Sequence, residues 1–381
     1  MRMVVSLTCY LIAVFLSVQI ATQRYRKMTC IIEKRELEGQ KDIDSYSKMT
    51  LTMAIVIALL FTLYNVIVTH LNVSVSGDRQ NYSLNFFGYR NSSSAGLMFI
   101  IGLIRKVSSR VESLYYVSTF ITMLITMLAY RESDEADPKA IFFLLTTQYV
   151  FFTFAGMKQC YTNAFASLCI VLALRNKGIK DTVVSIILIA LSIWFHPTGY
   201  LLIPLYIMIR IRKTIRINVL FFLLMIVGVL FLEPLLLHAA RLAAPFAPSV
   251  ATKIYDYFGE TAKEGLEAAG FMSALKGIPF YIITLVGWIN RQKLKDLIPN
   301  YENYLFLSGV ISFIYVASVY NSWVNRVAYF LYLPVAIFFV QLMRNVSNEN
   351  NYRIINTSVI GINALFTLRF VVLVYINYGG F

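Results

Sequence analysis

The amino-acid sequence predicts an all-α protein whose helices span a membrane. The chain is 58% hydrophobic and 15% aromatic, and its mean hydropathy is +0.65, well above the apolar usage of soluble domains. Long apolar runs recur from one end of the sequence to the other, and basic residues gather in every second loop between them. These observations exclude a soluble globular protein.

Apolar runs of about 17 to 25 residues can cross a bilayer as helices, and the sequence contains about twelve candidates of uneven length. The long ones are 3–21, 49–70, 111–130, 139–156, 217–232, 301–320, 326–343 and 354–376. The shorter ones, which need tilting or local bilayer thinning, are 160–174, 181–196, 198–211 and 276–290. Because no repeat or soluble domain interrupts them, we expect one transmembrane domain over 1–381.

The positions of Lys and Arg predict the orientation of these spans. They cluster at 22–48, 175–180, 210–216 and 291–295, and loops rich in Lys and Arg stay in the cytoplasm. A cleaved signal peptide at 1–21 would put the basic 22–48 segment outside, so we expect a first membrane helix instead. Both termini are then outside. The net charge of +14 follows this loop pattern, so no nucleic-acid partner is expected.

Two predicted outer segments are longer than a turn. The segment 71–110 contains "SAGLMFIIGLIRKVSS" (94–109), whose apolar part is too short to cross and ends in Arg105 and Lys106. We expect a short interfacial or re-entrant helix there. The segment 233–275 has proline breaks followed by helix-compatible sequence, and we interpret it as an outer lid or groove wall.

Polar residues recur at the helix ends and loops predicted to face outside. His196 ends the span 181–196, and Pro197 then turns the chain back. Arg369 lies about two turns below the outer end of the last span, where a charge must face protein or water, or snorkel to the headgroups. The other outer polar residues that we single out are Asp78, Arg79, Tyr82, Lys158, Gln159, Asn325 and Arg326.

Convergent cations predict an anionic ligand, and Arg and Lys at a membrane surface suit a lipid phosphate. A carboxylate or imidazole could act as a general base for a sugar hydroxyl, and Asp78 and His196 are the two candidates. Asp78 could instead be a turn residue, and His196 a hydrogen-bonded helix end. The four cysteines lack metal-ligand spacing, and no carboxylate cluster faces outside, so neither a metal nor a cofactor is predicted.

Four segments, in this order, resemble the EpsG family of exopolysaccharide and O-antigen polymerases, the Wzy-type enzymes. They are "SGDRQNY", "MKQCYTNAFA", "FHPTGYLLIP" and "NRVAYFLYLP", and they lie between about residues 70 and 335. The resemblance implies a polytopic, GT-C-like protein of the bacterial inner membrane. It also implies a glycosyltransferase that joins repeat units carried on undecaprenyl pyrophosphate at the periplasmic face, without a nucleotide sugar, in O-antigen, capsule or exopolysaccharide synthesis.

The resemblance also assigns site residues. Asp78 and Tyr82 match the family's Asp-x-x-x-Tyr loop, and His196 matches its Phe-His-x-Ser/Thr motif. Arg326, followed by Tyr329 and Phe330, matches an Arg-x-x-Tyr-Phe element. Lys158 with Gln159 stands where Arg-Gln is usual, which keeps the charge but loses the planar fork that binds phosphate with two hydrogen bonds.

We therefore expect Asp78 to take the proton of the acceptor hydroxyl, with His196 as the alternative base or as a substrate contact. Lys158 and Arg326, with Arg79 and Arg369, would stabilise charge on the leaving pyrophosphate. The expected partners are the lipid-linked glycan donor and acceptor and membrane lipid. A membrane protein that regulates chain length is a further candidate partner. A flippase or transporter, an outer-face O-antigen ligase, an acyltransferase and a non-catalytic scaffold are the alternatives.

Overall fold

The computed structural model of the chain is all-helical, and no strand occurs among the residues that it describes. The described residues are 2–37, 49–70, 78–90, 94–133, 137–147, 149, 156–211, 232–246, 248, 251–252, 255, 267–319, 322–345 and 349–378. The predicted span 217–232 therefore lies almost wholly outside them, as does the part of the segment 233–275 between 256 and 266. The all-helical prediction is confirmed.

The chain divides into two compact units. The first contains residues 1–211, 332–340 and 364–381, and the second contains 212–331 and 341–363. The helices of the first unit are α1 (Arg2–Leu37), α2 (Leu51–His70), α3 (Asp78–Phe87), α4 (Ala95–Arg105), α5 (Glu112–Glu132), α6 (Pro138–Leu145), α8 (Met157–Arg175), α9 (Ile179–Phe195), η1 (Pro197–Leu201) and α10 (Leu202–Ile211), with parts of α19 (Tyr332–Asn345) and α20 (Glu349–Tyr378).

Four helices in the described residues are long and apolar enough to cross a membrane: Val4–Gln23, Leu51–His70, Glu112–Glu132 and Val324–Asn345. Shorter apolar helices are Ala95–Arg105, Pro197–Ile211 and Ile278–Ile289. This supports a membrane protein, while the count of about twelve spans stays a prediction. α1 continues well past the predicted end of the first span, as one helix of 36 residues.

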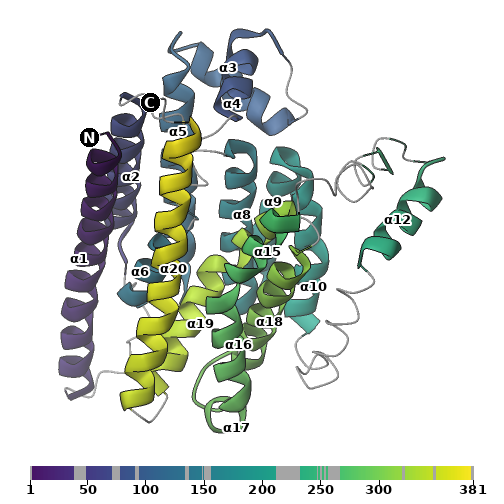
Figure 1. The fold of residues 1–381 in the computed structure, drawn as a ribbon. Coiled ribbons are helices and arrows are strands. Elements are labelled where there is room, and N and C mark those ends of the chain that lie inside the picture. Colours follow the sequence, from purple (N-terminus) through teal and green to yellow (C-terminus); the bar gives the residue numbers. More distant parts are fainter. Residues whose placement is uncertain are drawn as a thin grey trace. The chain divides into compact units, whose positions relative to one another are not determined.

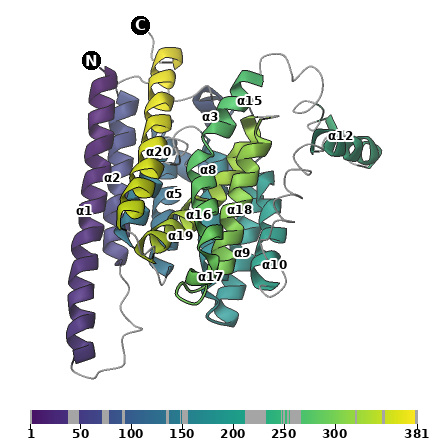
Figure 2. The ribbon, with the colours of Figure 1, turned by 60° about the horizontal axis from the view of Figure 1, so that its bottom comes forward.

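The centre of the first unit is a row of packed helices. α5 packs against α2 and α8, and α8 packs against α9. α1 and α2 run side by side in Figures 1 and 2, and Ser6 near the start of α1 hydrogen-bonds Tyr64 near the end of α2. These neighbours are therefore antiparallel.

α5 carries a buried stripe of hydroxyl groups along one face. Ser118, Thr119, Thr122 and Thr126 are all at most 1% exposed. Thr122 and Thr126 each donate to the carbonyl four residues earlier, at 2.8 Å, and Thr126 also pairs with the Tyr149 hydroxyl. The middle of α5 is therefore not uniformly apolar, and its neutral hydroxyls find partners inside the protein.

The predicted span 139–156 is not one continuous helix. α6 stops at Leu145, and Thr146 and Thr147 form a turn. Their hydroxyls bond the carbonyls of Phe143 and Leu144, and such local side-chain bonds compete with helix propagation. The carbonyls of Leu145 and Thr146 accept hydrogen bonds from Tyr10 of α1 and Thr367 of α20. The broken helix end is thus satisfied by protein groups, as low-dielectric surroundings require.

The second unit contains α12 (Leu232–Ala243), α15 (Glu267–Leu275), α16 (Ile278–Ile289), α17 (Arg291–Leu294), α18 (Tyr301–Ala317) and η2 (Ser322–Leu331). Thr284 of α16 donates to the Ser308 carbonyl of α18 at 2.7 Å, and the Phe280 and Tyr315 rings stack at 5.3 Å. η2 is a 3₁₀-helix, so the predicted span 326–343 begins in this tighter form and becomes α-helical only at Tyr332.

Candidate functional site

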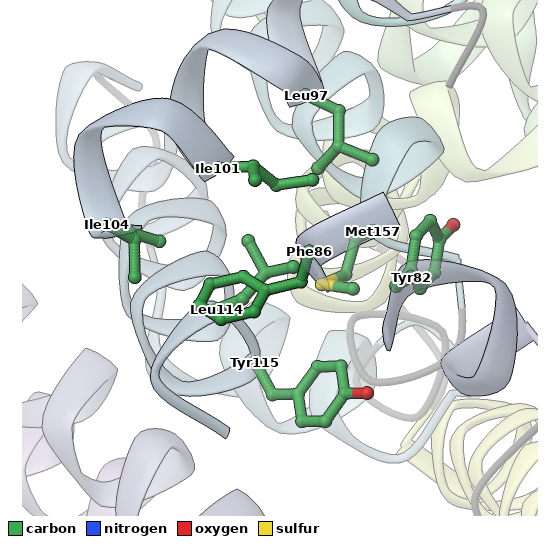
Figure 3. Close-up of a cluster of buried hydrophobic side chains, with 8 residues drawn as sticks. All are labelled: Tyr82, Phe86, Leu97, Ile101, Ile104, Leu114, Tyr115 and Met157. Carbon is green, nitrogen blue, oxygen red and sulfur yellow. The ribbon is translucent and has the colours of Figure 1, made fainter. Parts of the chain in front are cut away.

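A buried apolar cluster marks one end of the first unit. It joins α3, α4 and the first turns of α5 and α8, and Figure 3 shows its side chains. Its members are Tyr82, Phe86, Leu97, Ile101, Ile104, Leu114, Tyr115 and Met157. We call the end of the first unit that carries this cluster the α3 end. In Figure 1 the N-terminal end of α1 and the C-terminal end of α20 lie at the same end.

α9 finishes at the α3 end too. Thr162 of α8 donates to the Ser192 carbonyl of α9 at 2.9 Å, and Ser94, which caps α4, donates to the Phe195 carbonyl at 2.7 Å. His196 follows Phe195 directly, and Lys158 lies one turn before Thr162. The α3 end therefore brings His196 and Lys158 to the same side of the helix bundle as Arg79 and Tyr82.

Arg79 is the second residue of α3 and is only 9% exposed. Its Nη2 donates to Asn65 Oδ1 at 2.7 Å, and its Nη1 donates to Thr69 Oγ1 at 3.1 Å, both on α2. Its Cζ lies 4.6 Å from the centroid of the Tyr115 ring, within the range of a cation–π interaction. Neutral groups from two spanning helices thus hold a buried guanidinium.

Among the residues whose side chains the structure describes, which do not include Asp78, Arg79 forms no ion pair. The ion pairs formed by described residues involve other cations, and Arg79 Nε is buried without a hydrogen-bond partner. Burial lowers the pKa of the guanidinium, and the neighbouring Tyr115 and Tyr116 oppose this effect, but arginine keeps its proton near pH 7. A buried cation with an unused donor is suited to an anionic ligand.

Asp78 is the first residue of α3, and its side chain lies outside the described residues, so its role as a base stays a prediction. Tyr82 stands one helical turn later, is 4% exposed and belongs to the apolar cluster. The Arg79 carbonyl accepts hydrogen bonds from Ser83 at 3.0 Å and from the Tyr115 hydroxyl at 3.1 Å. These contacts fix the first turn of α3 against α5.

Lys158 and Gln159, which the sequence placed just before the span 160–174, lie in the first turn of α8. Lys158 is half-buried. Gln159 is 3% exposed and its Nε2 has no hydrogen-bond partner. Asn163, one turn further along α8, is 1% exposed and its Oδ1 also lacks a partner. Buried amides with unused groups mark places where water or substrate completes the hydrogen bonding.

His196 lies between two helices. It ends α9 with extended backbone angles (φ −155°, ψ 140°) and caps η1, whose Thr198 N–H donates to His196 Nδ1 at 3.2 Å. The Thr198 hydroxyl lies 2.8 Å from the same nitrogen. The sequence prediction of a hydrogen-bonded helix end is therefore correct for Nδ1, and the ring is held rather than freely rotating.

Arg369, in the first-unit part of α20, is exposed. The exposure fits the snorkelling interpretation better than a buried site. Asn325 and Arg326 belong to η2 in the second unit, where Asn325 is 9% exposed and donates to Ser273 Oγ at 3.3 Å. Arg326 is half-buried. The binding roles predicted for all three stay predictions.

The sequence did not single out Asn65, which organises the α3 end. Asn65 is fully buried, its Oδ1 accepts from Arg79, and its Nδ2 donates to Thr119 Oγ1 at 2.7 Å and to the Tyr115 carbonyl at 3.2 Å. One amide thereby connects α2, α3 and α5. A single asparagine in the apolar run 49–70 was the available signal, because a polar group in a span must find a partner inside the protein.

These features define a helical membrane protein in which cations and a held imidazole meet at one end of a helix bundle. The chain matches the model of the EpsG family over residues 42–380, and it belongs to that family. Membership confirms the resemblance of the four sequence segments and associates the chain with polymerisation of exopolysaccharide. No curated protein and no solved structure is significantly similar to it.

Proposed function

We propose that this chain is a polysaccharide polymerase of the bacterial inner membrane. It joins oligosaccharide repeat units carried on undecaprenyl pyrophosphate at the periplasmic face, using a GT-C-like body of about twelve spans with both termini outside. The observation that carries the proposal is Arg79, a buried guanidinium held by neutral groups. A substrate that brings negative charge to the α3 end would pair with this cation, which forms no ion pair among the described residues.

The reaction transfers a glycan from one lipid carrier to the non-reducing end of a second lipid-linked unit. The acceptor oxygen forms a bond to the anomeric carbon, and the bond from that carbon to the pyrophosphate oxygen breaks. The electron pair stays with the pyrophosphate, and the acceptor proton goes to a base. Fixed cations stabilise the charge that develops on the pyrophosphate.

Each residue at the α3 end has a part in this scheme. Arg79 and Lys158 face the pyrophosphate charge, and Asp78 takes the acceptor proton. Tyr82 and Gln159 line the substrate-binding end, where the buried Gln159 amide has an unused donor for a sugar or phosphate oxygen. The chemistry needs no nucleotide sugar, because the carrier pyrophosphate is itself the leaving group.

The test uses a cell whose polymer depends on this protein. Asp78→Asn removes the base, and we expect polymer elongation to fall by about 10²–10⁴-fold, with His196→Ala also impaired. Gel profiles of the polysaccharide measure chain length, and immunoblots of membrane fractions check the amount of protein. Arg105→Gln is the matched control, because Arg105 is exposed on α4 of the same end. Unchanged chain length in both site variants would overturn the proposal.

One observation favours a second function, a carrier that moves lipid-linked glycan across the membrane. Broken helices at membrane depth are typical of secondary transporters, and α6 is interrupted in this way. Purified protein in vesicles separates the two: transport of labelled lipid-linked glycan without lengthening identifies a carrier. Transfer of finished polymer or of an acyl group to another acceptor would identify an outer-face ligase or acyltransferase.

A further inference from the structure

We infer that His196 acts in the proposed polymerase as a hydrogen-bond donor through Nε2, and that Thr198 is the positioning residue that fixes this role. The inference rests on the proposed function and deepens it. Between the two candidate bases of the α3 end, it leaves Asp78 as the group that takes the acceptor proton.

The direction of one hydrogen bond determines which nitrogen of His196 carries the proton. A backbone N–H only donates, so the contact from Thr198 N to His196 Nδ1 at 3.2 Å makes Nδ1 an acceptor. A neutral imidazole carries its proton on the other nitrogen when one nitrogen accepts. Nε2 therefore holds the proton, and in this form it cannot take a second one from a sugar hydroxyl.

The backbone around His196 is fixed. The Phe195 carbonyl accepts from Ser94 of α4, and the Phe195 ring stacks on Tyr161 with centroids 4.3 Å apart. On the other side, the Gly199 N–H donates to the His196 carbonyl at 2.9 Å. A Cβ on Gly199 would lie 2.5 Å from the Ile193 nitrogen, so only glycine allows η1 to fold this tightly onto α9.

The tautomer of His196 with the proton on Nδ1 would destabilise the start of η1. With the proton on Nδ1, the ring could donate to the Thr198 hydroxyl at 2.8 Å, but it would also point a donor at the Thr198 N–H, and the cap of η1 would be lost. Pro197 is the first residue of η1 and has no N–H of its own, so the Thr198 N–H is the first amide that needs an acceptor. The local fold thus selects the tautomer in which Nε2 donates.

The chemical consequence concerns the leaving group. A donor fixed in orientation strengthens its hydrogen bond as charge develops on an oxygen in the transition state. His196 Nε2–H would donate to an oxygen of the departing pyrophosphate and keep its proton throughout. The acceptor proton goes to Asp78 and the electron pair of the broken bond goes to the pyrophosphate, so the step balances without proton transfer at His196.

Substitutions that place an amide at one or the other ring nitrogen test this role. The glutamine amide nitrogen reaches the position of imidazole Nε2, whereas the asparagine amide reaches only that of Nδ1. We expect His196→Gln to retain about a tenth or more of wild-type elongation, and His196→Asn and His196→Ala to lose about 10²–10³-fold. Equal loss in all three variants, with normal amounts of protein, would overturn the inference.

A spectroscopic measurement reads the tautomer without relying on activity. The chain has three histidines, so ¹⁵N-histidine labelling in nanodiscs, with His196→Gln to assign the signal, resolves His196. We expect the proton on Nε2 in the wild type and the same tautomer in Thr198→Ser, with a mixture of tautomers in Thr198→Pro, which lacks the N–H. A proton on Nδ1 in the wild type would overturn the inference.

These outcomes are separable from failure of the proposed function. If Asp78→Asn and Arg79→Gln leave chain length unchanged, the polymerase proposal fails, whatever the tautomer. If those variants are defective but His196→Gln is as inactive as His196→Ala and the proton lies on Nδ1, the polymerase stands and the donor role of His196 is wrong.

Discussion

The two ends of the first unit each hold an arginine away from full solvent exposure, and the two arginines have different kinds of partner. Away from the α3 end, Arg175 at the end of α8 binds both oxygens of Asp181 on α9 and also pairs with Glu132 at the end of α5. At the α3 end, Arg79 contacts the amide of Asn65, the hydroxyl of Thr69 and the ring of Tyr115. Two carboxylates neutralise the first cation, whereas the contacts that described residues make with the second come from neutral groups.

The charge of the partner groups therefore distinguishes a cation with a structural role from a cation that is suited to bind a ligand. Arg175 is half-buried and Arg79 is buried, and both guanidiniums are held by hydrogen bonds. Their partners differ in charge. Arg175 joins the ends of α5, α8 and α9 through ion pairs, whereas Arg79 has no ion pair and one buried N–H without a partner among the described residues.

The largest expected effect is the loss of activity in Arg79→Gln. Glutamine can still bond α2 but carries no charge, so elongation should fall by about 10²–10³-fold while the protein stays folded. Chain-length gels and a thermal melt of the purified protein check both expectations. Normal elongation would show that Arg79 only holds α3 against α2. It would contradict the conclusion that Arg79, unlike Arg175, binds an anionic ligand.

Thr69→Asp should give Arg79 a carboxylate partner, as Arg175 has at the other end of the first unit. The new carboxylate would face Arg79 Nη1, which now lies 3.1 Å from the Thr69 hydroxyl, and the substrate phosphate would have to compete with it. We expect elongation to fall about tenfold. Thr69→Val is the control of similar shape without charge and should stay near wild type. Equal activity of the two variants would contradict an anionic ligand for Arg79.

Arg175→Gln should reduce stability rather than chemistry. It leaves Asp181 buried with the Lys177 N–H as its remaining described partner, which costs about 1–3 kcal/mol. The thermal-denaturation midpoint should drop, and elongation per folded molecule should be preserved. A large loss of activity at an unchanged midpoint would place a functional site at this end as well.

Gly96→Ala should disturb the geometry of the α3 end without changing its charge. A Cβ at Gly96 would lie 2.9 Å from the Phe195 ring, which the Tyr161 ring backs, so overpacking should cost about 1–3 kcal/mol. Gly102 lies on the same helix with open space around it, and Gly102→Ala should be neutral or slightly stabilising. Thermal melts of the pair measure the difference, and equal midpoints would contradict close packing of α4 on α9.

Apolar runs and the alternation of basic loops were enough to predict an all-helical membrane protein, because helix length and hydropathy are local properties. They also predicted that Lys158 and His196 would lie at helix ends. The pairing of Arg79 with Asn65 was not predictable from the sequence. Arg79 belongs to the predicted outer segment 71–110, and Asn65 is a single polar residue in the apolar run 49–70, where hydropathy gives it little weight.

The break after α6 escaped prediction for a related reason. Hydropathy cannot distinguish a helix from a turn when the turn residues are Thr146 and Thr147 in an apolar run. The hydroxyl stripe of α5 was visible at Ser118, Thr122 and Thr126, which are four residues apart, but a search for charged groups passes over neutral hydroxyls. Their significance depends on which helix packs against them.

The interrupted helix also bears on how the protein is made. The Thr146 carbonyl accepts from Thr367, 221 residues later in the chain, and the Leu145 carbonyl accepts from Tyr10. During synthesis the ribosome delivers Tyr10 before α6 and Thr367 long after it. The Thr146 carbonyl therefore acquires its Thr367 partner only after α20 has been synthesised and has packed against this turn.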